Sequence, residues 1–577
     1  MSEDLNQYRQ PTLPSRNLGW NMYGAGVDAQ GADGKPEPIE VGPPDADQLL
    51  IRIDAVGLCY SDAKLVKQGG DHPKLYHRDL ANDPTRLGHE ATVTILDVGE
   101  ALTDRFTPGQ RLAVNPDIHT DGRSTAYGYT IPGALIRYHL IGPEVLDADD
   151  GSYVIPIDDS IGYAAAALSE PWGCVEAAYT QRRRLSPLEG GVMWVLGRPD
   201  DPTEYQFSEG LDRPGRIITT NVPPQVMAMI DDKKRPDTAI EVRDDIDDYA
   251  GFAAEVTGGD GFDDIVLLDP RSSDQVEALA PHIAFRGILN LVGTERLDGM
   301  PGIDVGRIHY HYTALVGNPG PDIAASYGLA RNRSELKPGG ITLVVGAGGP
   351  MGQMHMQRAI ELDDGPRTII ASDLDEARLA FATDRLAPLA RAKGIEFIPV
   401  NPAGDPSTLA DAVAAATGER GADDIILSVP VPAVMEQGAA LLAPDGMLVL
   451  FAGVPNGSLA ALNVSDVYLA NAQFTGTSGL STADQRLVLD KAKAGTLSPQ
   501  RSLGAVGSIE AVTEGLQALI DGTFPGKVMI FPQLTGLPLT GLDDLAERHP
   551  DIGSKLAEDG AWTTEAEAAL IDKFWQR

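Results

Sequence analysis

The sequence predicts an α/β protein with a β-rich first region followed by two tandem doubly wound domains, the first of them degenerate. A length of 577 residues is too great for a single core and favours two to four domains. The first region has short β-type runs broken by Gly and Pro, whereas the middle of the chain alternates β-type runs with helical stretches. That alternation is typical of a parallel sheet with crossover helices.

The two doubly wound domains are predicted from a repeat. "TGGDGFDDIVLLDP", beginning at Thr257, and "TGERGADDIILSVP", beginning at Thr417, agree at eight of fourteen positions. "GGVMWVLG" at Gly190 corresponds to "GGITLVVG" at Gly339, and further pairs follow in the same order at a nearly constant offset. An ordered series of this kind indicates a duplicated unit of nucleotide-binding size.

The composition excludes several classes of protein. No run of about 18 uncharged apolar residues occurs, and the N-terminus has no apolar segment, so neither a membrane span nor a signal peptide is expected. The two cysteines, Cys59 and Cys174, exclude a disulfide framework and favour the cytoplasm. A formal charge of -37 repels phosphate backbones and argues against a nucleic-acid partner.

The later copy has the features of a dinucleotide site. The strand "ITLVV" leads into "GAGGPMGQMHMQRAIEL", where Gly349 and Gly352 take the second and third glycine positions of G-x-G-x-x-G. The first position falls on Ala347, with Gly346 one residue early, so the fingerprint is shifted. Glycine lets backbone amides approach a pyrophosphate, whose charge the helix N-terminus favours. The expected cofactor-binding residues of this loop are Gly346, Gly348, Gly349, Met351 and Gly352.

The next strand of the later copy ends in Asp373. Its spacing of about 20 residues from the loop is that of the acid that binds the ribose in dinucleotide folds. A carboxylate accepts hydrogen bonds from a 2′-hydroxyl and repels a 2′-phosphate, so NAD is favoured over NADP. The structural alternative is a tight strand–helix turn followed by a surface aspartate.

The earlier copy has lost the corresponding features. Its turn has the sequence "VLGRPDDPTEYQF", in which only Gly197 remains of the glycines. Asp200 and Asp201 would place negative charge near the phosphates, and the following strand ends at Asn221 instead of an acid. We therefore expect one cofactor site from two copies of the scaffold.

The β-rich region contains three candidate zinc ligands. Cys59 lies in "VGLCYSDAKL", His89 follows about thirty residues later in "TRLGHEATV", and Glu170 lies in "LSEPWGCVEAAY". A thiolate, an imidazole and a carboxylate are zinc ligands, and three protein ligands leave a position open for water or substrate. Singly, each has an ordinary alternative: a packed cysteine, a structural histidine, and a helix start at Glu170-Pro171.

These motifs together resemble the zinc-dependent medium-chain dehydrogenase/reductase family, which includes alcohol and polyol dehydrogenases. The resemblance rests on "GLCYSD", "GHEATVTILDVGE" and "LSEPWGCVEAAY", followed by a glycine-loop nucleotide fold. Within the family, "DLANDPTRLGHE", "GPMG" and "VPAVMEQGAALLAPDGMLVLFAG" are similar to enzymes of the L-sorbose 1-phosphate reductase type. The resemblance covers residues 40–180 and about 335–530.

The resemblance implies a GroES-like catalytic domain and an NAD-binding Rossmann domain. We expect five segments along the chain: a GroES-like zinc catalytic domain (1–185), a degenerate Rossmann-like repeat (186–335), an NAD-binding Rossmann domain (336–480), a return to the catalytic domain (481–532) and a helical C-terminal extension (533–577).

The resemblance also implies roles for individual residues. Cys59, His89 and Glu170 look like the catalytic zinc ligands. Glu90 follows the histidine as in the family's Gly-His-Glu, and is either a carboxylate behind the ligands or an alternate ligand. Ser61 matches the hydroxyl that passes the substrate proton towards solvent.

The number of zinc ions follows from the cysteine count. Many relatives carry a four-cysteine structural zinc lobe, which cannot form here because only Cys174 follows Cys59. One catalytic zinc and no structural zinc are expected. Cys174 lies one helical turn past Glu170, so it is either a further ligand or a packed thiol.

The implied activity is hydride transfer between NAD(H) and a polyol, sugar alcohol or sugar phosphate, which interconverts an alcohol and a ketone or aldehyde. A basic loop, "KQGGDHPKLYHRD", could hold a phosphate group or be an ordinary solvated loop. Lys64, one helical turn past Tyr60, could face the same site. The basic residues of the loop are Lys67, His72, Lys74, His77 and Arg78.

Two other functions are compatible with parts of the sequence. The chain could be a non-catalytic NAD-binding scaffold derived from a dehydrogenase, because one nucleotide copy has already decayed. A zinc-free activity like that of quinone reductases is the other alternative. The set of Cys59, His89 and Glu170 argues against both.

The earlier copy suggests an internal pseudo-dimer. In the family, nucleotide-binding domains of two subunits join edge to edge through their last strands. The earlier copy keeps its counterpart of that strand, "IHYHYTALVG", although it has lost its phosphate loop. We expect strands near Tyr310 and Phe474 to lie in one continuous sheet, because an unpaired edge strand tends to be covered.

Overall fold

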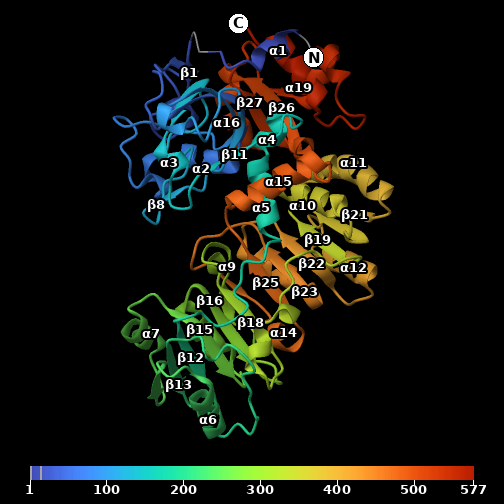
Figure 1. Cartoon of the computed structure of the whole chain (residues 1–577). Helices are drawn as coiled ribbons and strands as arrows, with labels where there is room; N and C mark the ends of the chain where they lie inside the picture. The colour runs from blue at the N-terminus through green and yellow to red at the C-terminus, as the bar shows by residue number, and fades with distance from the viewer. Residues whose placement is uncertain (1–2, 13–15, 577) are drawn as a thin grey trace. The chain divides into compact units, whose positions relative to one another are not determined.

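A computed structural model describes residues 3–12 and 16–576, and the chain divides into two compact units (Figure 1). The first unit combines Met1–Ala177 with Gly479–Arg577, and the second consists of Ala178–Ser478. The chain therefore leaves the first unit, builds the second and returns. Among the described residues, no helix is both long enough and apolar enough to span a bilayer.

The first unit is built on an eight-stranded sheet. All ten residues of its central strand, "LLIRIDAVGL", are buried, which explains why this segment is almost continuously apolar. In spatial order the strands are β11 (Val154–Pro156), β7 (Arg111–Val114), β6 (Glu90–Val98), β4 (Leu49–Leu58), β27 (Lys527–Phe531), β26 (Leu503–Ser508) and β28 (Thr540–Gly541), with β10 (Tyr138–Ile141) also paired to β4.

Helices from both ends of the sequence pack on this sheet. Helix α2 follows β4, and α4 leads almost directly into α5, which packs against α15. The helices of this unit are α1 (Glu3–Tyr8), α2 (Tyr60–Gln68), α3 (Pro143–Leu146), α4 (Tyr163–Ala167), α5 (Ser169–Ala177), α15 (Thr482–Ala494), α16 (Val512–Asp521), α17 (Leu542–Arg548), α18 (Pro550–Gly553) and α19 (Thr564–Phe574).

The C-terminal extension is helical and is tied into the unit's core. Glu567 of α19 is buried, and its carboxylate accepts the backbone N–H groups of Tyr163, at 2.6 Å, and Ala164, at 2.8 Å. These are the first residues of α4, so the extension caps that helix from a distance in sequence. Tyr8 of the N-terminal helix packs edge-on against Trp575, with ring centroids 5.5 Å apart.

The second unit contains two six-stranded parallel sheets with the same strand order. Each follows the 3-2-1-4-5-6 order of the doubly wound dinucleotide fold. The first sheet is β14 (Ala239–Arg243), β13 (Arg216–Thr220), β12 (Val192–Leu196), β15 (Phe262–Leu268), β16 (Ile283–Val292) and β18 (Ala314–Asn318). The second is β21 (Glu396–Val400), β20 (Thr368–Ser372), β19 (Ile341–Val345), β22 (Ala422–Leu427), β23 (Leu442–Leu450) and β25 (Gln473–Gly476).

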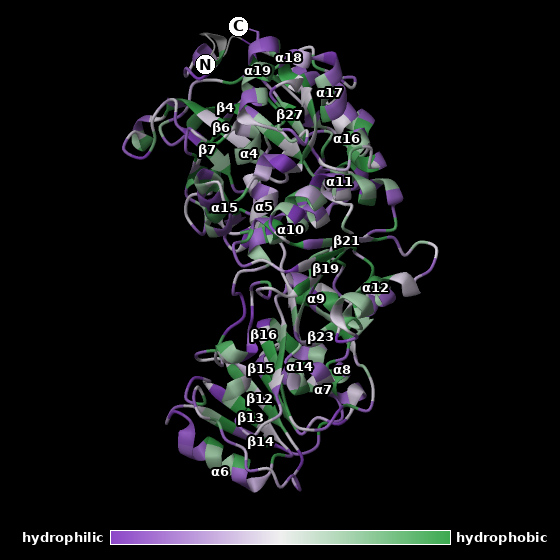
Figure 2. Ribbon diagram, turned by 90° about the vertical axis from the view of Figure 1, so that its right-hand side faces the viewer, coloured by the Kyte–Doolittle hydropathy of each residue, from purple (hydrophilic) through white to green (hydrophobic). Residues whose placement is uncertain are grey.

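Most helices of the two copies correspond. The central strands of both sheets are apolar and the helices are two-faced, as expected when helices cover a parallel sheet (Figure 2). The first copy has α6 (Pro224–Lys233), α7 (Tyr249–Thr257), α8 (Ser273–Leu279) and α9 (Val305–Tyr310). The second has α10 (Pro350–Glu361), α11 (Glu376–Ala392), α12 (Ser407–Thr417), α13 (Pro432–Ala439) and α14 (Ser465–Leu469).

The first copy lacks one helix in its described residues, at the turn that has lost the glycines. Strand β19 is followed at once by α10, whereas residues 197–215, after β12, contain no helix. Tyr205, Phe207 and Leu211 of that connection are buried and belong to the apolar cluster on β12 and β13. The degenerate copy thus covers the sheet face with an irregular segment.

The repeated stretch has a structural explanation in both copies. Each copy ends its helix at a left-handed glycine, and the preceding threonine accepts a backbone N–H from the tight turn. Thr257 Oγ1 accepts from Gly261 N at 3.0 Å, and Thr417 Oγ1 accepts from Gly421 N at 3.2 Å. The repeat therefore preserves the connection between a helix and its strand.

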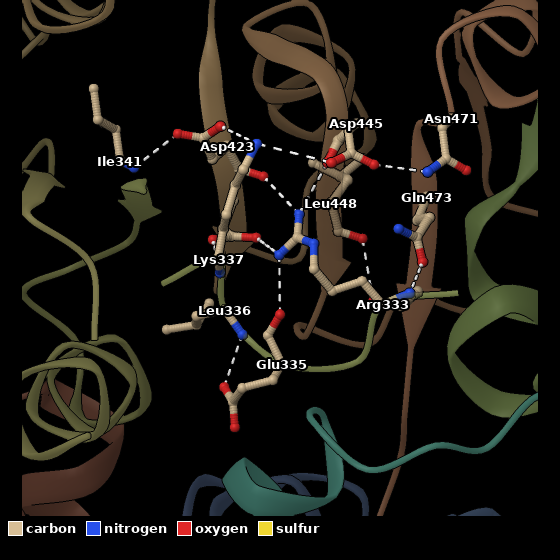
Figure 3. Close-up of polar contacts among 12 residues, drawn as sticks. Arg333, Glu335, Leu336, Lys337, Ile341, Asp423, Asp445, Leu448, Asn471 and Gln473 are labelled. Atoms are coloured by element: carbon tan, nitrogen blue, oxygen red, sulfur yellow. Dashed lines mark hydrogen bonds and ion pairs between the residues drawn. The ribbon is translucent and has the colours of Figure 1, made fainter. Parts of the chain in front are cut away.

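The paired aspartates of the stretch anchor the segment that leads into each copy. In the second copy, Arg333 donates to Asp424, and Asp424 also accepts from Lys337 N at 2.8 Å. Figure 3 shows the neighbouring contacts of Arg333 with the carbonyl oxygen of Glu335, at 2.9 Å, and of Lys337 with Asp423, at 3.0 Å. In the first copy, Arg184 donates to Asp264, which accepts from Leu188 N at 3.0 Å. Burial raises the pKa of both aspartates, and the arginines oppose that shift.

The two copies contact each other, but not through one continuous sheet. Strands β18 and β25 lie side by side at the facing edges, yet the described strands form two separate sheets. A short antiparallel ladder joins the copies instead, between β17 (Gly302–Asp304) and β24 (Leu459–Ala461). The prediction of a continuous sheet is wrong, since β18 and β25 are neighbours without a ladder between them and helix α9 packs against the end of β25.

The prediction of a strand around Tyr310 is wrong, because Tyr310 is the last residue of helix α9. "IHYHYTALVG" divides into the end of α9, a short turn and β18, so Tyr310 is helical. His309 of α9 is buried against the second copy, and its Nδ1 lies 3.1 Å from the carbonyl oxygen of Leu450. A Cβ on Gly306 would lie 2.5 Å from the carbonyl oxygen of Pro455, so glycine permits this close approach.

Candidate active site

Cys59 is positioned by the junction of a strand and a helix. It follows β4 and is the N-cap residue of α2. Asp62, in the first turn of α2, accepts the backbone N–H of Cys59 at 2.9 Å and completes a capping box. The thiol of Cys59 lies 3.6 Å from Ser61 Oγ, so two of the predicted site residues are neighbours.

His89 is held from behind by the same aspartate. It lies between Gly88, which has φ +92, and the first residue of β6. Its Nδ1 is 3.3 Å from Asp62 Oδ1, and both side chains are buried. Burial disfavours charge on the imidazole, but Asp62 outweighs burial and raises the pKa of His89 well above its usual value. Since Asp62 lies beside Nδ1, Nε2 is the ring nitrogen better placed for a metal.

Glu90 lies beside these two residues and completes a metal-binding group. One ligand atom from each of Cys59, His89 and Glu90 lies within 4.8 Å of the others. Gly57, opposite Glu90 in the β4–β6 ladder, makes room, since a Cβ there would lie 2.0 Å from Glu90 Oε2. Lys527, the first residue of β27, forms a buried ion pair with Glu90 Oε1.

The donor set fits a zinc ion. It offers a sulfur, an imidazole nitrogen and a carboxylate oxygen, the ligand types that zinc prefers. Within the described part of the chain, Glu90 Oε2 is buried without a hydrogen-bond partner. A buried carboxylate oxygen is costly unless paired, and a cation would satisfy it.

Glu170 lies near this group but outside it. It is the second residue of α5 and is 6% exposed. Burial raises the pKa of Glu170 to about 8, while His89 lowers it and Glu90 raises it further, so the three charges interact. The Cys174 thiol is 3.9 Å from Glu170 Oε1, and burial raises the pKa of Cys174 as well.

Sequence reasoning gave no role to Asp62 and missed Lys527. Asp62 was visible in "GLCYSD", and its spacing of three residues from Cys59 is the signal of a capping box. Lys527 lies 437 residues from Glu90 and begins an ordinary strand, so no local pattern reveals it. It is brought to the site because β27 pairs with β4.

The glycine loop of the second copy has the geometry expected of a phosphate-binding turn. Gly346 has φ +81 and makes the tight turn, and Gly349 is the N-cap of α10. A Cβ on Gly352 would lie 2.1 Å from the carbonyl oxygen of Gly346, so this glycine allows helix and loop to pack closely. Gly348 lies at the middle of the loop, and Met351 lies in the first turn of α10.

Asp373 contacts the loop directly. It follows β20, and its Oδ2 accepts the backbone N–H of Gly348 at 2.8 Å. Arg378 lies close by, because a Cβ on Gly348 would be 2.7 Å from the Cβ of Arg378. Sequence reasoning missed Arg378, a cation in the first turn of α11 beside the aspartate.

The corresponding place in the first copy is filled by its own residues. Asp201 accepts the hydroxyl of Tyr205 at 2.7 Å and the backbone N–H of Thr203 at 3.0 Å. Asn221, the counterpart of Asp373, donates to Asp245. With residues 197–215 containing no helix, no helix N-terminus follows β12 to receive a pyrophosphate.

Two parts of the chain match known protein families. Residues 45–145 match the alcohol dehydrogenase GroES-like domain, and residues 350–494 match the zinc-binding dehydrogenase family. The Cys59–His89–Glu90 group lies within the first match, and the second match begins inside the glycine loop, at Pro350.

Relatives match almost the whole chain. A mannitol-1-phosphate 5-dehydrogenase of Aliivibrio fischeri is 34% identical over 92% of this chain and 92% of its own length. An L-sorbose 1-phosphate reductase of Klebsiella pneumoniae is 30% identical over 91% of each chain. The fold is similar to that of 2R,3R-butanediol dehydrogenase from Bacillus subtilis, with a TM-score of 0.50 and 16% identity over 89% of this chain and 99% of that one.

Proposed function

This chain belongs to the zinc-dependent medium-chain dehydrogenase family, and we propose that it transfers hydride between NAD(H) and a polyol, sugar alcohol or sugar phosphate. The observation that carries the proposal is the close group of Cys59, His89 and Glu90, with Asp62 behind the histidine. The relatives named for sugar-phosphate substrates support the substrate class.

Each residue of the group has a role in this proposal. Zinc held by Cys59, His89 and either Glu90 or Glu170 would supply Lewis-acid chemistry that acidifies an alcohol, and NAD would supply the hydride acceptor. We assign to Ser61 the transfer of the substrate's hydroxyl proton towards solvent, which its position 3.6 Å from the Cys59 thiol supports.

The charges around the group favour the proposed chemistry. Lys527 compensates one oxygen of Glu90 and leaves the other available to a metal. Asp62 orients His89 and balances its charge. A carboxylate at Glu90 and a protonated Glu170 can therefore coexist, because burial favours the neutral form of the latter.

We propose NAD as the preferred cofactor, bound by Gly346, Gly348, Gly349, Met351, Gly352 and Asp373. The carboxylate of Asp373 beside the loop supports this preference. Asp373→Ser should lower the ratio of kcat/KM for NAD over NADP at least tenfold, because the repulsion of a 2′-phosphate disappears. Asp375→Ser, in the same turn, is the control. A higher kcat/KM for NADP in the unmodified protein would contradict the assignment.

The first copy has an architectural role in this proposal. It would act as a built-in second subunit that covers the edge of the NAD-binding domain, which the β17–β24 ladder and the packing of α9 support. The five-segment assignment and a cytoplasmic location, supported by two free cysteines, belong to the same proposal.

The deciding experiment measures activity and zinc on one preparation. A panel of polyols and their phosphates is assayed with NAD and NADP, and zinc is determined per chain. We expect NAD reduction with at least one polyol or polyol phosphate, loss of activity on chelation and recovery with zinc. A non-catalytic NAD-binding scaffold would bind NAD but turn over none of the panel at any zinc content.

A further inference from the structure

The basic residues of the loop next to the candidate metal site differ in the groups that they contact. Arg78 is committed to the loop itself, donating to the carbonyl oxygens of Asp83, at 2.9 Å, and Thr130, at 2.8 Å. His77 is exposed and pairs with Asp71, also exposed, at 3.6 Å. These two residues stabilise or solvate the loop, whereas His72 and Lys74 both contact the ring of Tyr129.

His72 and Lys74 are fixed by one short turn. His72 is the N-cap of a single 3-10 turn, Pro73–Leu75, and its Nδ1 accepts the backbone N–H of Lys74 at 3.2 Å. The neutral ring therefore carries its proton on Nε2, which remains a donor. The Lys74 ammonium lies 5.1 Å from the ring centroid of Tyr129 and 3.7 Å from Asp117.

Tyr129 connects this turn to the metal-binding group. Its ring centroid lies 5.6 Å from that of His89 on one side and 5.8 Å from that of His72 on the other. The ring of Tyr129 thus lies between the candidate metal ligand His89 and the turn that begins at His72.

Lys64 adds a second ammonium from α2. It is exposed, lies five residues after Cys59, and its ammonium is 5.7 Å from the ring centroid of Tyr60. Burial lowers the pKa of His72, and the charges of Lys74 and then Lys64 lower it further, which favours the neutral ring. Among the described residues, Lys64 forms no ion pair.

We propose that Lys74, His72 and Lys64 form an anion subsite that binds the phosphate of a phosphorylated polyol whose hydroxyl lies at the Cys59–His89–Glu90 group. This inference rests on the proposed function and assigns its substrate class to phosphorylated polyols. Two ammonium groups and an imidazole N–H supply the donors that a phosphate dianion needs. In a chain with a formal charge of -37, a dianion requires such local compensation.

The test compares phosphorylated and plain substrates in matched variants. D-Mannitol with D-mannitol 1-phosphate and D-sorbitol with D-sorbitol 6-phosphate are assayed with the unmodified protein, Lys74→Gln and Lys64→Gln. We expect the ratio of kcat/KM for the phosphorylated over the plain substrate to fall about 10- to 100-fold in Lys74→Gln and less in Lys64→Gln. Lys74→Arg should keep most of the ratio.

The control is Lys67→Gln, since Lys67 is exposed in the last turn of the same helix as Lys64. Its ratio should equal that of the unmodified protein. A second measurement needs no turnover: inorganic phosphate should raise the Tm of the unmodified protein and of Lys67→Gln, and raise that of Lys74→Gln less.

Two outcomes would overturn the inference while leaving the proposed function intact. The first is an active enzyme that discriminates no phosphorylated substrate and whose Tm does not respond to phosphate. The second is an equal effect of Lys67→Gln and Lys74→Gln on the ratio. Absence of turnover with every substrate at full zinc content would instead contradict the proposed function.

Discussion

Asp62 is buried where Cys59, Gly88 and His89 meet, and it contacts all three. Its carboxylate accepts the backbone N–H of Cys59 at 2.9 Å and of Gly88 at 3.4 Å, and pairs with His89 Nδ1. One side chain therefore holds the backbone of Cys59 and the imidazole of His89, which come from two different segments. Groups that orient metal ligands in this way affect metal affinity nearly as much as the ligands do.

Asp62→Asn should weaken zinc binding about 10- to 100-fold while the fold is retained, because the amide keeps the shape but loses the charge beside His89. Zinc affinity is measured by competition with a chromogenic chelator, and circular dichroism checks the fold. Asp71→Asn, at an exposed position in the same region, should bind zinc like the unmodified protein. Equal zinc affinity in both variants would contradict the role given to Asp62.

At the scale of elements, the C-terminal helix controls the helix pair that carries Glu170. Glu567 of α19 caps α4, and α4 leads directly into α5. No other part of the extension binds those two N–H groups among the contacts described. The extension is therefore part of the first unit's structure, although the family matches end before it.

Glu567→Ala should lower the free energy of unfolding by about 2–4 kcal/mol, because two buried backbone N–H groups lose their acceptor. Urea unfolding followed by tryptophan fluorescence measures the change. Glu565→Ala, exposed in the same helix turn, should change the stability by less than about 0.5 kcal/mol. Similar losses in both variants would show that the cap does not matter.

The contact between the two copies depends on how closely helix α9 approaches the second copy. Gly306 brings α9 against the loop after β23, where a Cβ would lie 2.5 Å and 2.8 Å from two carbonyl oxygens. These are backbone atoms, so the contact can be relieved only by moving the copies apart.

Gly306→Ala should therefore destabilise the protein by about 1–3 kcal/mol. Gly328→Ala, in the same copy, is the matched control because the nearest atom to its Cβ would be 3.6 Å away. Thermal unfolding and the rate of limited proteolysis compare the two. A stable, protease-resistant Gly306→Ala protein would show that the two copies do not depend on this close contact.

At the scale of the whole molecule, the number of NAD molecules and zinc ions per chain follows from a duplication in which one copy keeps the features of a cofactor site. The second copy has the glycine loop, α10 and Asp373, whereas Asp201 and Tyr205 fill the corresponding place in the first. We expect one NAD and one zinc per chain, measured by isothermal titration calorimetry and metal analysis. Two NAD molecules per chain would contradict the architectural role of the first copy, and two zinc ions would contradict the single catalytic site.

The sequence by itself determined the fold class and most of the site's chemistry. Alternating β-type and helical runs, and the repeated Thr-Gly and Asp-Asp positions, are local patterns that depend only on neighbouring residues. Cys59, His89 and the glycine loop could be recognised for the same reason. The degenerate turn of the first copy predicted a loss of dinucleotide binding, whereas the missing helix after β12 was not predicted.

Only the tertiary structure decided which groups meet. Glu90, not Glu170, joins Cys59 and His89 within 4.8 Å, because Gly57 on the neighbouring strand leaves room for its side chain. Lys527 arrives from 437 residues away through strand pairing. The contact between copies runs through α9 and a two-stranded ladder, since close packing of backbone and side chains overrides what one segment prefers alone. Such long-range pairings depend on the folded chain, so no local pattern records them.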